Sequence, residues 1–166
     1  MPQEMLARLF EHNHWANLQI IDICLGMSDE ALDAEPPAAA YGSIRSTLLH
    51  LVRAQQGYLR LLTVPLEERL ERVELDFHDV RSSAKASGEG FVALAQDAAV
   101  LDAKSQIETS DGYRVDPWVI VVQAINHATE HREQIKLMLT SLGHTAPDLD
   151  GWTYGEVTGA LVPISH

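Results

Sequence analysis

The feature that most constrains the fold is a long amphipathic segment from about residue 117 to residue 142. Asp116 is a good N-cap, Pro117 suits the first helical position, and Gly143 suits the position after the last turn. Between these ends, apolar residues recur at steps of three and four, as one buried face of a helix requires. They are Trp118, Val121, Ile125, Ala128, Ile135, Leu139 and Leu142. The spacing predicts a helix of about seven turns that buries this face against other helices.

The same segment places two imidazoles beside its apolar face. His127 and His131 belong to the adjoining strip of the helix, together with Ala124, Gln134 and Met138. Residues four apart on a helix are neighbours, with Cβ atoms roughly 5–6 Å apart, so the two rings can bind one metal ion. A His-x-x-x-His pair is a weak signal by itself, and it needs a third ligand from another part of the chain.

Three more helical segments are predicted upstream. Residues 3–25 and 44–62 keep a helical period of apolar positions. A third helix is expected from about residue 76 to residue 101, where Gly88 and Gly90 each cost about 1 kcal/mol relative to alanine. These glycines weaken the middle of that helix and allow a kink or an interruption there.

Two shorter regions complete the outline. Around Asp111-Gly112 the pattern alternates, with Ile107 before the turn and Val115 after it, which indicates a small β-hairpin. The tail after residue 143 has aromatic residues but no helical run, and we expect it to pack over one end of the helices. Four long helices with short or crossover links predict an all-α fold: a single four-helix-bundle domain over residues 1–166, with a small β-hairpin before the last long helix.

The charge balance limits what such a bundle can bind. Acidic residues outnumber basic ones by 24 to 12, the formal net charge is -12, and the basic residues are scattered, so nucleic acid and anionic membranes would be repelled. The N-terminus lacks the order of a signal peptide, and no apolar run approaches the roughly 18–20 residues of a membrane span. We expect a cytoplasmic protein that acts on a small molecule. The single cysteine, Cys24, lies among apolar residues and is expected to be buried rather than reactive.

His50 is the expected third ligand, because it borders the apolar face of the helix at 44–62. If that helix runs antiparallel to the one at 117–142, His50 lies roughly 20 Å from the end of its helix and the histidine pair roughly 15–21 Å from the start of the other. The three rings can then share one level. Three neutral imidazoles leave coordination positions for water or a substrate, as in catalytic metal sites. We expect a divalent metal, zinc or nickel before iron or manganese, although imidazole alone does not distinguish them.

Four stretches of the chain carry a resemblance to a known family. They are Trp15-Ala16-Asn17, Gly42-Ser43-Ile44 followed by Leu48-Leu49-His50-Leu51-Val52, the hairpin around Asp111-Gly112, and His127-Ala-Thr-Glu-His131-Arg132-Glu133-Gln134-Ile135. With these stretches the chain resembles, over nearly its whole length, the DinB/YfiT-like family of metal-dependent enzymes. In that family the corresponding histidines bind a divalent metal, which implies His50, His127 and His131 as ligands. The second histidine of the pair is usually followed by Arg-Gly-Gln, and Glu133 stands here in place of the glycine.

The resemblance also implies a class of reaction. Relatives include transferases and isomerases that use low-molecular-weight thiols such as bacillithiol, mycothiol or glutathione. A metal held by three neutral histidines keeps enough positive charge to deprotonate a coordinating thiol at neutral pH. We therefore expect a metal-dependent thiol transferase. The alternatives are a hydrolase in which the metal activates water, and a metal-binding bundle without turnover.

Other residues of the motif have less certain roles. His127-Ala-Thr-Glu130-His131 also matches His-x-x-Glu-His, the signature of inverted zinc peptidases, in which Glu130 is the general base. Such peptidases are usually larger and need a distant carboxylate ligand, so we rank this reading lower and keep Glu130 as a candidate general base. Arg132 and Gln134 are candidates for cofactor binding, or else residues of a solvated helix face. Bundles of this kind often pair through exposed apolar faces, so a homodimer is expected.

Overall fold

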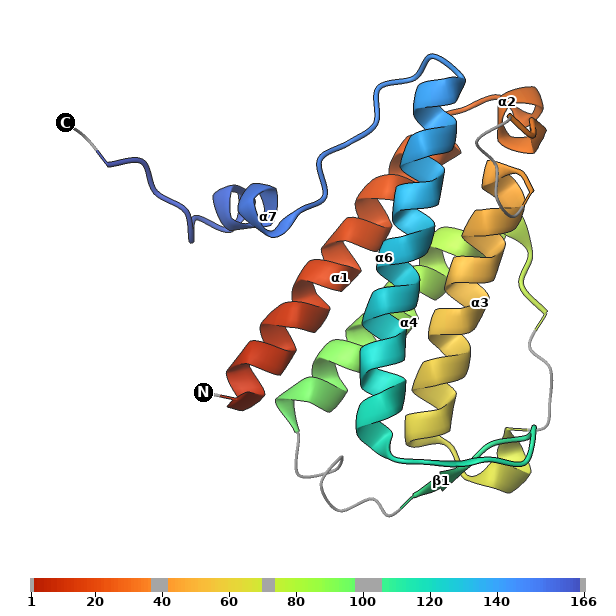
Figure 1. Ribbon diagram of the computed structural model, residues 1–166, viewed down its shortest axis with the longest axis vertical. Coiled ribbons are helices and arrows are strands. Elements are labelled where there is room, and N and C mark those ends of the chain that lie inside the picture. Colours follow the sequence, from red (N-terminus) through yellow and green to blue (C-terminus); the bar gives the residue numbers. More distant parts are fainter. Residues whose placement is uncertain (1, 37–41, 70–73, 98–105, 165–166) are drawn as a thin grey trace.

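Four long helices form the body of the protein in a computed structural model that describes residues 2–36, 42–69, 74–97 and 106–164. They are α1 (Pro2–Leu25), α3 (Ile44–Thr63), α4 (Val80–Gln96) and α6 (Pro117–Ser141). Figure 1 shows α1 and α6 running upward and α3 and α4 running downward, so α3 and α6 are antiparallel. α1 and α3 each pack against both α4 and α6. The predicted four-helix bundle is confirmed.

The ends of α6 follow from its sequence. Asp116 is the N-cap residue and Pro117 opens the helix. At the other end, Gly143 has a φ of 80°, and the His144 N–H donates to the Leu139 carbonyl at 2.9 Å. This left-handed residue and the hydrogen bond across the last turn form a Schellman motif, which favours glycine because it has no Cβ.

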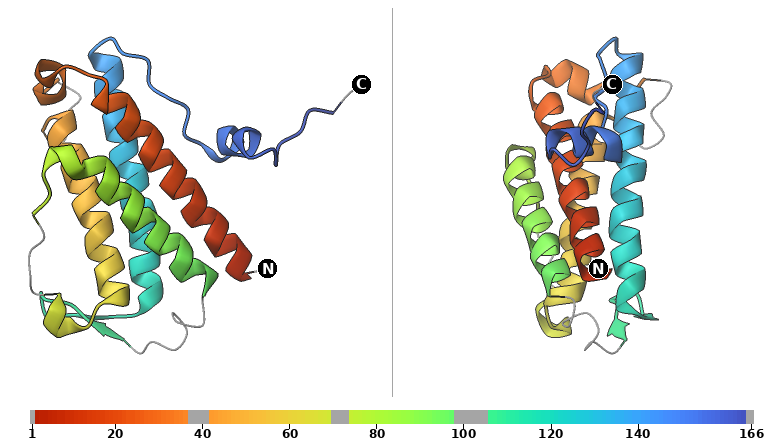
Figure 2. Two further views of the ribbon diagram at one scale, coloured as in Figure 1. Left: turned by 180° about the vertical axis from the view of Figure 1, so that it is seen from behind. Right: turned by 90° about the vertical axis from the view of Figure 1, so that its left-hand side faces the viewer.

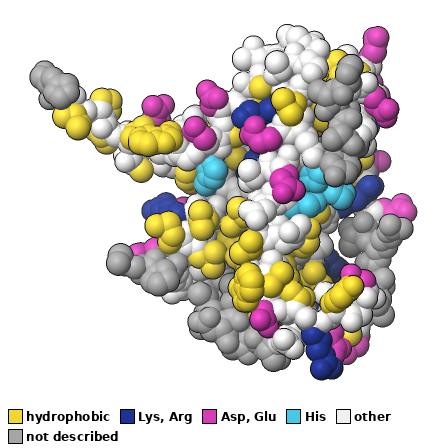
Figure 3. Space-filling view, in the orientation of Figure 1, with side chains coloured by type: hydrophobic (Ala, Val, Ile, Leu, Met, Phe, Trp, Pro, Cys, Tyr) yellow, Lys and Arg dark blue, Asp and Glu magenta, His cyan; other side chains and the backbone are white. Residues whose placement is uncertain are grey.

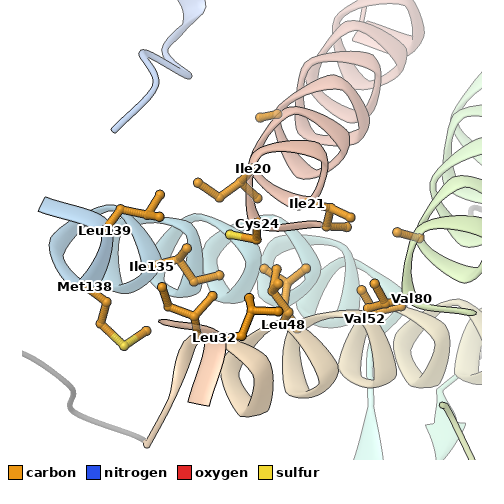
Figure 4. Packing of buried hydrophobic residues seen from close by; sticks show 14 of the residues in the cluster. Ile20, Ile21, Cys24, Leu32, Leu48, Val52, Val80, Ile135, Met138 and Leu139 are labelled. Atoms are coloured by element: carbon orange, nitrogen blue, oxygen red, sulfur yellow. The ribbon is translucent and has the colours of Figure 1, made fainter. Parts of the chain in front are cut away.

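The core consists of two clusters of apolar side chains, one toward each end of the bundle. Figure 4 shows the first, where Ile20 and Cys24 of α1, Leu48 of α3, and Ile135 and Leu139 of α6 meet between the helices. Burying each such side chain stabilises the fold by about 1.5–3 kcal/mol relative to leaving it exposed. The second cluster is centred on two stacked rings whose centroids are 4.7 Å apart. These are Phe10 of α1 and Phe91 of α4.

A chain of buried hydrogen bonds joins all four helices between these clusters. The Arg132 guanidinium of α6 donates to the side-chain oxygens of Asn13 (2.7 Å) and Asn17 (2.6 Å) on α1. The Asn17 amide donates to the Gln55 oxygen of α3 (2.6 Å), and the Gln55 amide donates to the Ser87 hydroxyl of α4 (2.7 Å). We call these five residues the buried polar network. Its members satisfy one another, which is what allows polar groups to remain inside the bundle.

The third long helix differs from the prediction of residues 76–101. α4 spans Val80–Gln96 and follows the 3-10 turn η2 (Phe77–Asp79), while residues 98–105 lie outside the described part of the chain. The helix is continuous through Gly88 and Gly90. A Cβ on Gly88 would lie 2.8 Å from the His14 Cγ of α1, and one on Gly90 would lie 2.5 Å from a Leu59 methyl of α3. The glycines therefore allow close helix packing instead of interrupting α4.

Gly88→Ala is expected to lower the free energy of unfolding by about 1–2 kcal/mol, because overpacking against the His14 ring exceeds the gain of up to about 1 kcal/mol in helix propensity. Urea denaturation measures the change. Gly57→Ala in α3 is the matched control, since nothing lies within 4 Å of its new Cβ. The control is expected to gain about 0.5–1 kcal/mol. A similar gain for Gly88→Ala would show that the contact between α1 and α4 is loose.

The predicted β-hairpin is confirmed. β1 (Ile107–Glu108) and β2 (Arg114–Val115) pair antiparallel just before α6, with Ile107 opposite Val115. Ile107 is buried and contributes to the second core cluster. The hairpin thus fastens one end of the bundle. Two short helices lie in the connections of α3, namely α2 (Asp29–Asp33) before it and the 3-10 turn η1 (Leu66–Glu68) after it.

The tail contains a helix that its glycine-rich sequence did not suggest. α7 spans Gly151–Val157, and the Asp150 side chain caps it by accepting the Thr153 N–H at 2.8 Å. The tail was expected to pack over one end of the bundle, and this prediction is wrong. α7 instead lies beside α1 and stands away from the other helices (Figure 2). Tyr154 holds it there, with its ring centroid 5.3 Å from that of Trp15. In the described residues, no helix has the length and apolar character that crossing a membrane needs.

Candidate metal centre

Three histidine side chains converge between α3 and α6. The His50 Nε2 lies 3.0 Å from the His127 Nε2, which lies 3.1 Å from the His131 Nε2. All three ligand atoms lie within 4.8 Å of one another, and no other such group of His, Cys, Asp or Glu occurs in the described residues. Nitrogen ligands at about 2.0–2.1 Å from one ion are themselves separated by about 3.0–3.4 Å. The spacing therefore fits one divalent metal ion.

The packing of α3 and α6 explains why the rings meet. Leu48 and Val52 on α3, and Ala128 and Ile135 on α6, are buried in the bundle and set the rotation of each helix. The histidines lie next to these positions, at the edge of the interface. His131 is only 6% exposed, His127 is half-buried and His50 is exposed. Because His50 is exposed, the centre is accessible from the solvent, and Figure 3 shows histidine side chains at the surface in this view.

Gln134 orients one of the three rings. Its side-chain oxygen accepts a hydrogen bond from the His131 Nδ1 at 2.7 Å. A proton on Nδ1 leaves Nε2 with a free lone pair, the tautomer that binds a metal from the side where the three rings meet. Gln134 was predicted as a cofactor-binding residue. In the structure it acts on the centre indirectly, through its hydrogen bond to His131.

Burial keeps two of the imidazoles neutral. Burial, together with smaller contributions from the nearby His131 and His50, lowers the pKa of His127 to about 4. Burial also lowers the pKa of His50, with smaller contributions from His131 and from the positive charge of Arg53. Because only neutral imidazole binds a metal, these two ligands are ready for an ion at neutral pH.

The structure places the other predicted site residues away from the three Nε2 atoms. Arg132 is 4% exposed and belongs to the buried polar network. Its guanidinium therefore lies inside the bundle, and not in a cofactor pocket or on a solvated helix face, the two positions suggested by the sequence. The reason is that α1 supplies two amide oxygens at this point. Glu130 is exposed and outside the group of ligand atoms, so its role as a base stays a prediction. Glu133 is also exposed and pairs with Lys136 at 3.0 Å.

A cleft of about 980 Å³, which was not predicted from the sequence, opens beside the centre. His50 and Tyr58 line it, and the Tyr58 ring also packs edge-on against His127, with centroids 5.6 Å apart. Three arginines line the same cleft, two of them on α3. The two arginines on α3 are Arg53 and Arg60, which follow His50 by three and by ten residues. This spacing places them on the same strip of the helix as His50, and it could have indicated the cleft.

Comparisons with known proteins agree with this fold. A crystal structure from Exiguobacterium sibiricum 255-15, provisionally assigned to the DinB family, is similar with a TM-score of 0.68 and 20% sequence identity. The match covers 89% of this chain and 97% of that one, and at this identity it shows the shared fold. The comparison with curated proteins finds no match. The sequence profile of the DinB family matches residues 1–162, and the chain therefore belongs to the DinB family.

Proposed function

We propose that this protein is a metal-dependent transferase that uses a low-molecular-weight thiol of the bacillithiol, mycothiol or glutathione type. The observation that carries the proposal is the convergence of His50, His127 and His131 at the accessible edge of two helices. They would hold zinc or nickel, and the same ligands also suit iron or manganese. An ion bound by three neutral imidazoles lowers the pKa of a coordinating thiol, so that its thiolate is present at neutral pH.

The protein's own cysteine does not supply this thiol. Cys24 is fully buried in the first core cluster, and burial raises the pKa of its thiol to about 12. It is therefore neither ionised nor accessible at neutral pH. A thiol that reacts at the histidine centre has to arrive as a separate molecule, which favours a small soluble thiol as the second substrate.

The residues around the centre have distinct tasks in this proposal. Gln134 and burial keep His131 in one orientation, while the exposed side of His50 leaves a path from the solvent to the ligands. The adjoining cleft, with Tyr58 between it and His127, has the volume for a small electrophilic substrate. The centre can thus receive a thiol and an electrophile side by side, which lowers the entropic cost of their reaction.

The test begins with the metal content per chain by elemental mass spectrometry, as purified and after reconstitution with zinc or nickel. About one equivalent is expected from a three-histidine site. The loaded protein is then assayed with glutathione, bacillithiol or mycothiol and a panel of electrophiles, before and after chelation. Thiol conjugation that disappears with the metal and returns with it supports the proposal.

Three results would contradict the proposal in different ways. Absence of bound metal after reconstitution removes the centre itself. A loaded protein that hydrolyses esters without any thiol, and conjugates none, is a hydrolase instead. A loaded protein without either activity is a metal-binding bundle without turnover.

A further inference from the structure

In the described part of this acidic protein, most basic side chains are paired with carboxylates. Of its 12 Lys and Arg residues, ten lie in the described part of the chain. Six of these form ion pairs and Arg132 belongs to the buried polar network. Three remain that form no ion pair with a described residue, and they are Arg53, Arg60 and Arg69.

All three of these arginines line the cleft beside the metal centre. Arg53 and Arg60 extend from α3, and Arg69 directly follows η1. Each donates one hydrogen bond to a neutral main-chain carbonyl, which positions the guanidinium without neutralising its charge. The acceptors are the carbonyls of Leu75, Glu68 and Glu108, at 2.9, 2.6 and 3.0 Å. Since a guanidinium has five N–H donors, each arginine keeps donors that form no hydrogen bond with a described residue.

Arg69 supplies a second, independent indication. Its Nε is shut off from solvent and has no hydrogen-bond partner among the described residues. Buried donors are nearly always satisfied in folded proteins, and an exception needs an explanation such as a ligand. An anionic oxygen bound within hydrogen-bond distance of this Nε would satisfy the donor and would also face the positive charge of the same group.

Three carboxylates also line the cleft, and they limit where an anion can bind. Glu74, Asp76 and Asp79 belong to the segment that leads into α4, are exposed, and form no ion pair with the cleft arginines. Asp76 accepts the His78 N–H at 2.9 Å and so caps η2. An anion is therefore expected to bind against α3 and η1 rather than against this segment.

The arginines are close enough to the histidine centre to act on the same ligand. Arg53 follows His50 by three residues on α3, which is about 4.5 Å along the helix axis. Because Arg53 and His50 line the same cleft, an anionic group at Arg53 and an atom that reacts at the centre can belong to one small molecule.

We propose that the cleft is the anion-binding part of the substrate site, in which Arg53, Arg60 and Arg69 bind a carboxylate or phosphate group of the small molecule that reacts at the three-histidine centre. The part of this inference that concerns a reaction at the histidine centre rests on the proposed function. Anion binding itself depends only on the arginines. Bidentate hydrogen bonds from guanidinium suit either group, and both share the paired oxygens that this geometry needs.

The test is a titration of the metal-reconstituted full chain with succinate and, separately, with inorganic phosphate, followed by calorimetry and by the arginine Nε–H signals in ¹⁵N NMR. Saturable binding is expected, with shifts of the signals of the three cleft arginines. Arg53→Gln and Arg69→Gln are each expected to weaken binding about tenfold or more, as loss of a charged hydrogen-bond donor does. Arg8→Gln is the matched control, because Arg8 is exposed on α1 and paired with Glu11.

The two anions and the metal content separate the outcomes. Preference for succinate or for phosphate identifies the substrate's anionic group. Absence of saturable binding by both, or equal weakening by Arg8→Gln, overturns the inference, and the signals of the unmodified protein decide the matter if a variant does not fold. Anion binding to a chain that retains no metal would support the arginine site while removing the proposed transferase.

Discussion

Asn17→Leu is expected to lower the free energy of unfolding by about 3–5 kcal/mol, a large part of the roughly 5–15 kcal/mol that stabilises a typical domain. Asn17 is fully buried at the centre of the buried polar network. Its oxygen accepts from Arg132 and its amide donates to Gln55, both at 2.6 Å. Leucine fills the space but leaves the Gln55 oxygen unsatisfied and the cation with fewer acceptors.

The positive charge makes this loss larger than that of a neutral hydrogen bond. Burial lowers the pKa of Arg132 to about 10, so the guanidinium stays charged at pH 7 inside the bundle. Its acceptors are the oxygens of Asn13, Asn17 and Thr129. A buried cation that loses an acceptor keeps its desolvation cost, whereas removing the cation and the acceptor together removes much of that cost.

Urea denaturation at pH 7 measures this effect, and a double-mutant cycle with Arg132→Met tests the coupling. The double variant is expected to be more stable than the sum of the two single losses indicates. Asn126→Leu is the control, because Asn126 is exposed on α6. This substitution should change the free energy of unfolding by no more than about 0.5 kcal/mol. Additive losses in the cycle would show that Asn17 and Arg132 act independently.

The long helices were predictable because their signals are local. α6 was expected over residues 117–142 and spans Pro117–Ser141, since the caps and the apolar period lie within the segment itself. The three ligands could also be placed, because His127 and His131 are four apart and an antiparallel neighbour brings His50 to their level. Family resemblance supported the same three residues.

The features that sequence reasoning missed depend on contacts between distant segments. Arg132 appeared to be a pocket or surface residue, because its partner Asn13 lies 119 positions away on α1. The cleft exists because the chain after α3 returns along that helix, so that Arg53 meets the carbonyl of Leu75. The tail helix was hidden for a different reason, since Asp150 caps a segment whose glycines argue against a helix.

The network and the metal centre meet on α6, where adjacent residues belong to each. His131 faces the other two imidazoles, and Arg132 faces α1. The rotation of α6 that buries Arg132 is therefore the one that directs His131 toward His50. This coupling links the stability of the bundle interior to the geometry of its metal ligands.

His127→Ala is expected to reduce bound metal from about one equivalent per chain to below about a tenth, because two imidazoles on different helices make a poor site for a divalent ion. The His127 Nε2 contacts both other ligand atoms, at 3.0 and 3.1 Å, so its loss removes the ligand that links His50 to His131. Elemental mass spectrometry after dialysis measures the change. Metal that binds only the folded state stabilises it, so the native protein should show a metal-dependent rise in thermal stability. His127→Ala should lose this rise.

His78→Ala and Gln134→Leu separate ligand loss from other effects. His78 has a side chain that is 92% exposed and stands outside the three-histidine group, so its removal should leave the metal content unchanged. Gln134→Leu keeps all three ligands but removes the acceptor of the His131 Nδ1–H, and metal affinity should fall by about 10- to 100-fold. Binding that is equally lost in all three variants would mean that the metal is held elsewhere or nonspecifically. A graded loss, complete for His127, partial for Gln134 and absent for His78, is the result that only an oriented three-histidine centre predicts.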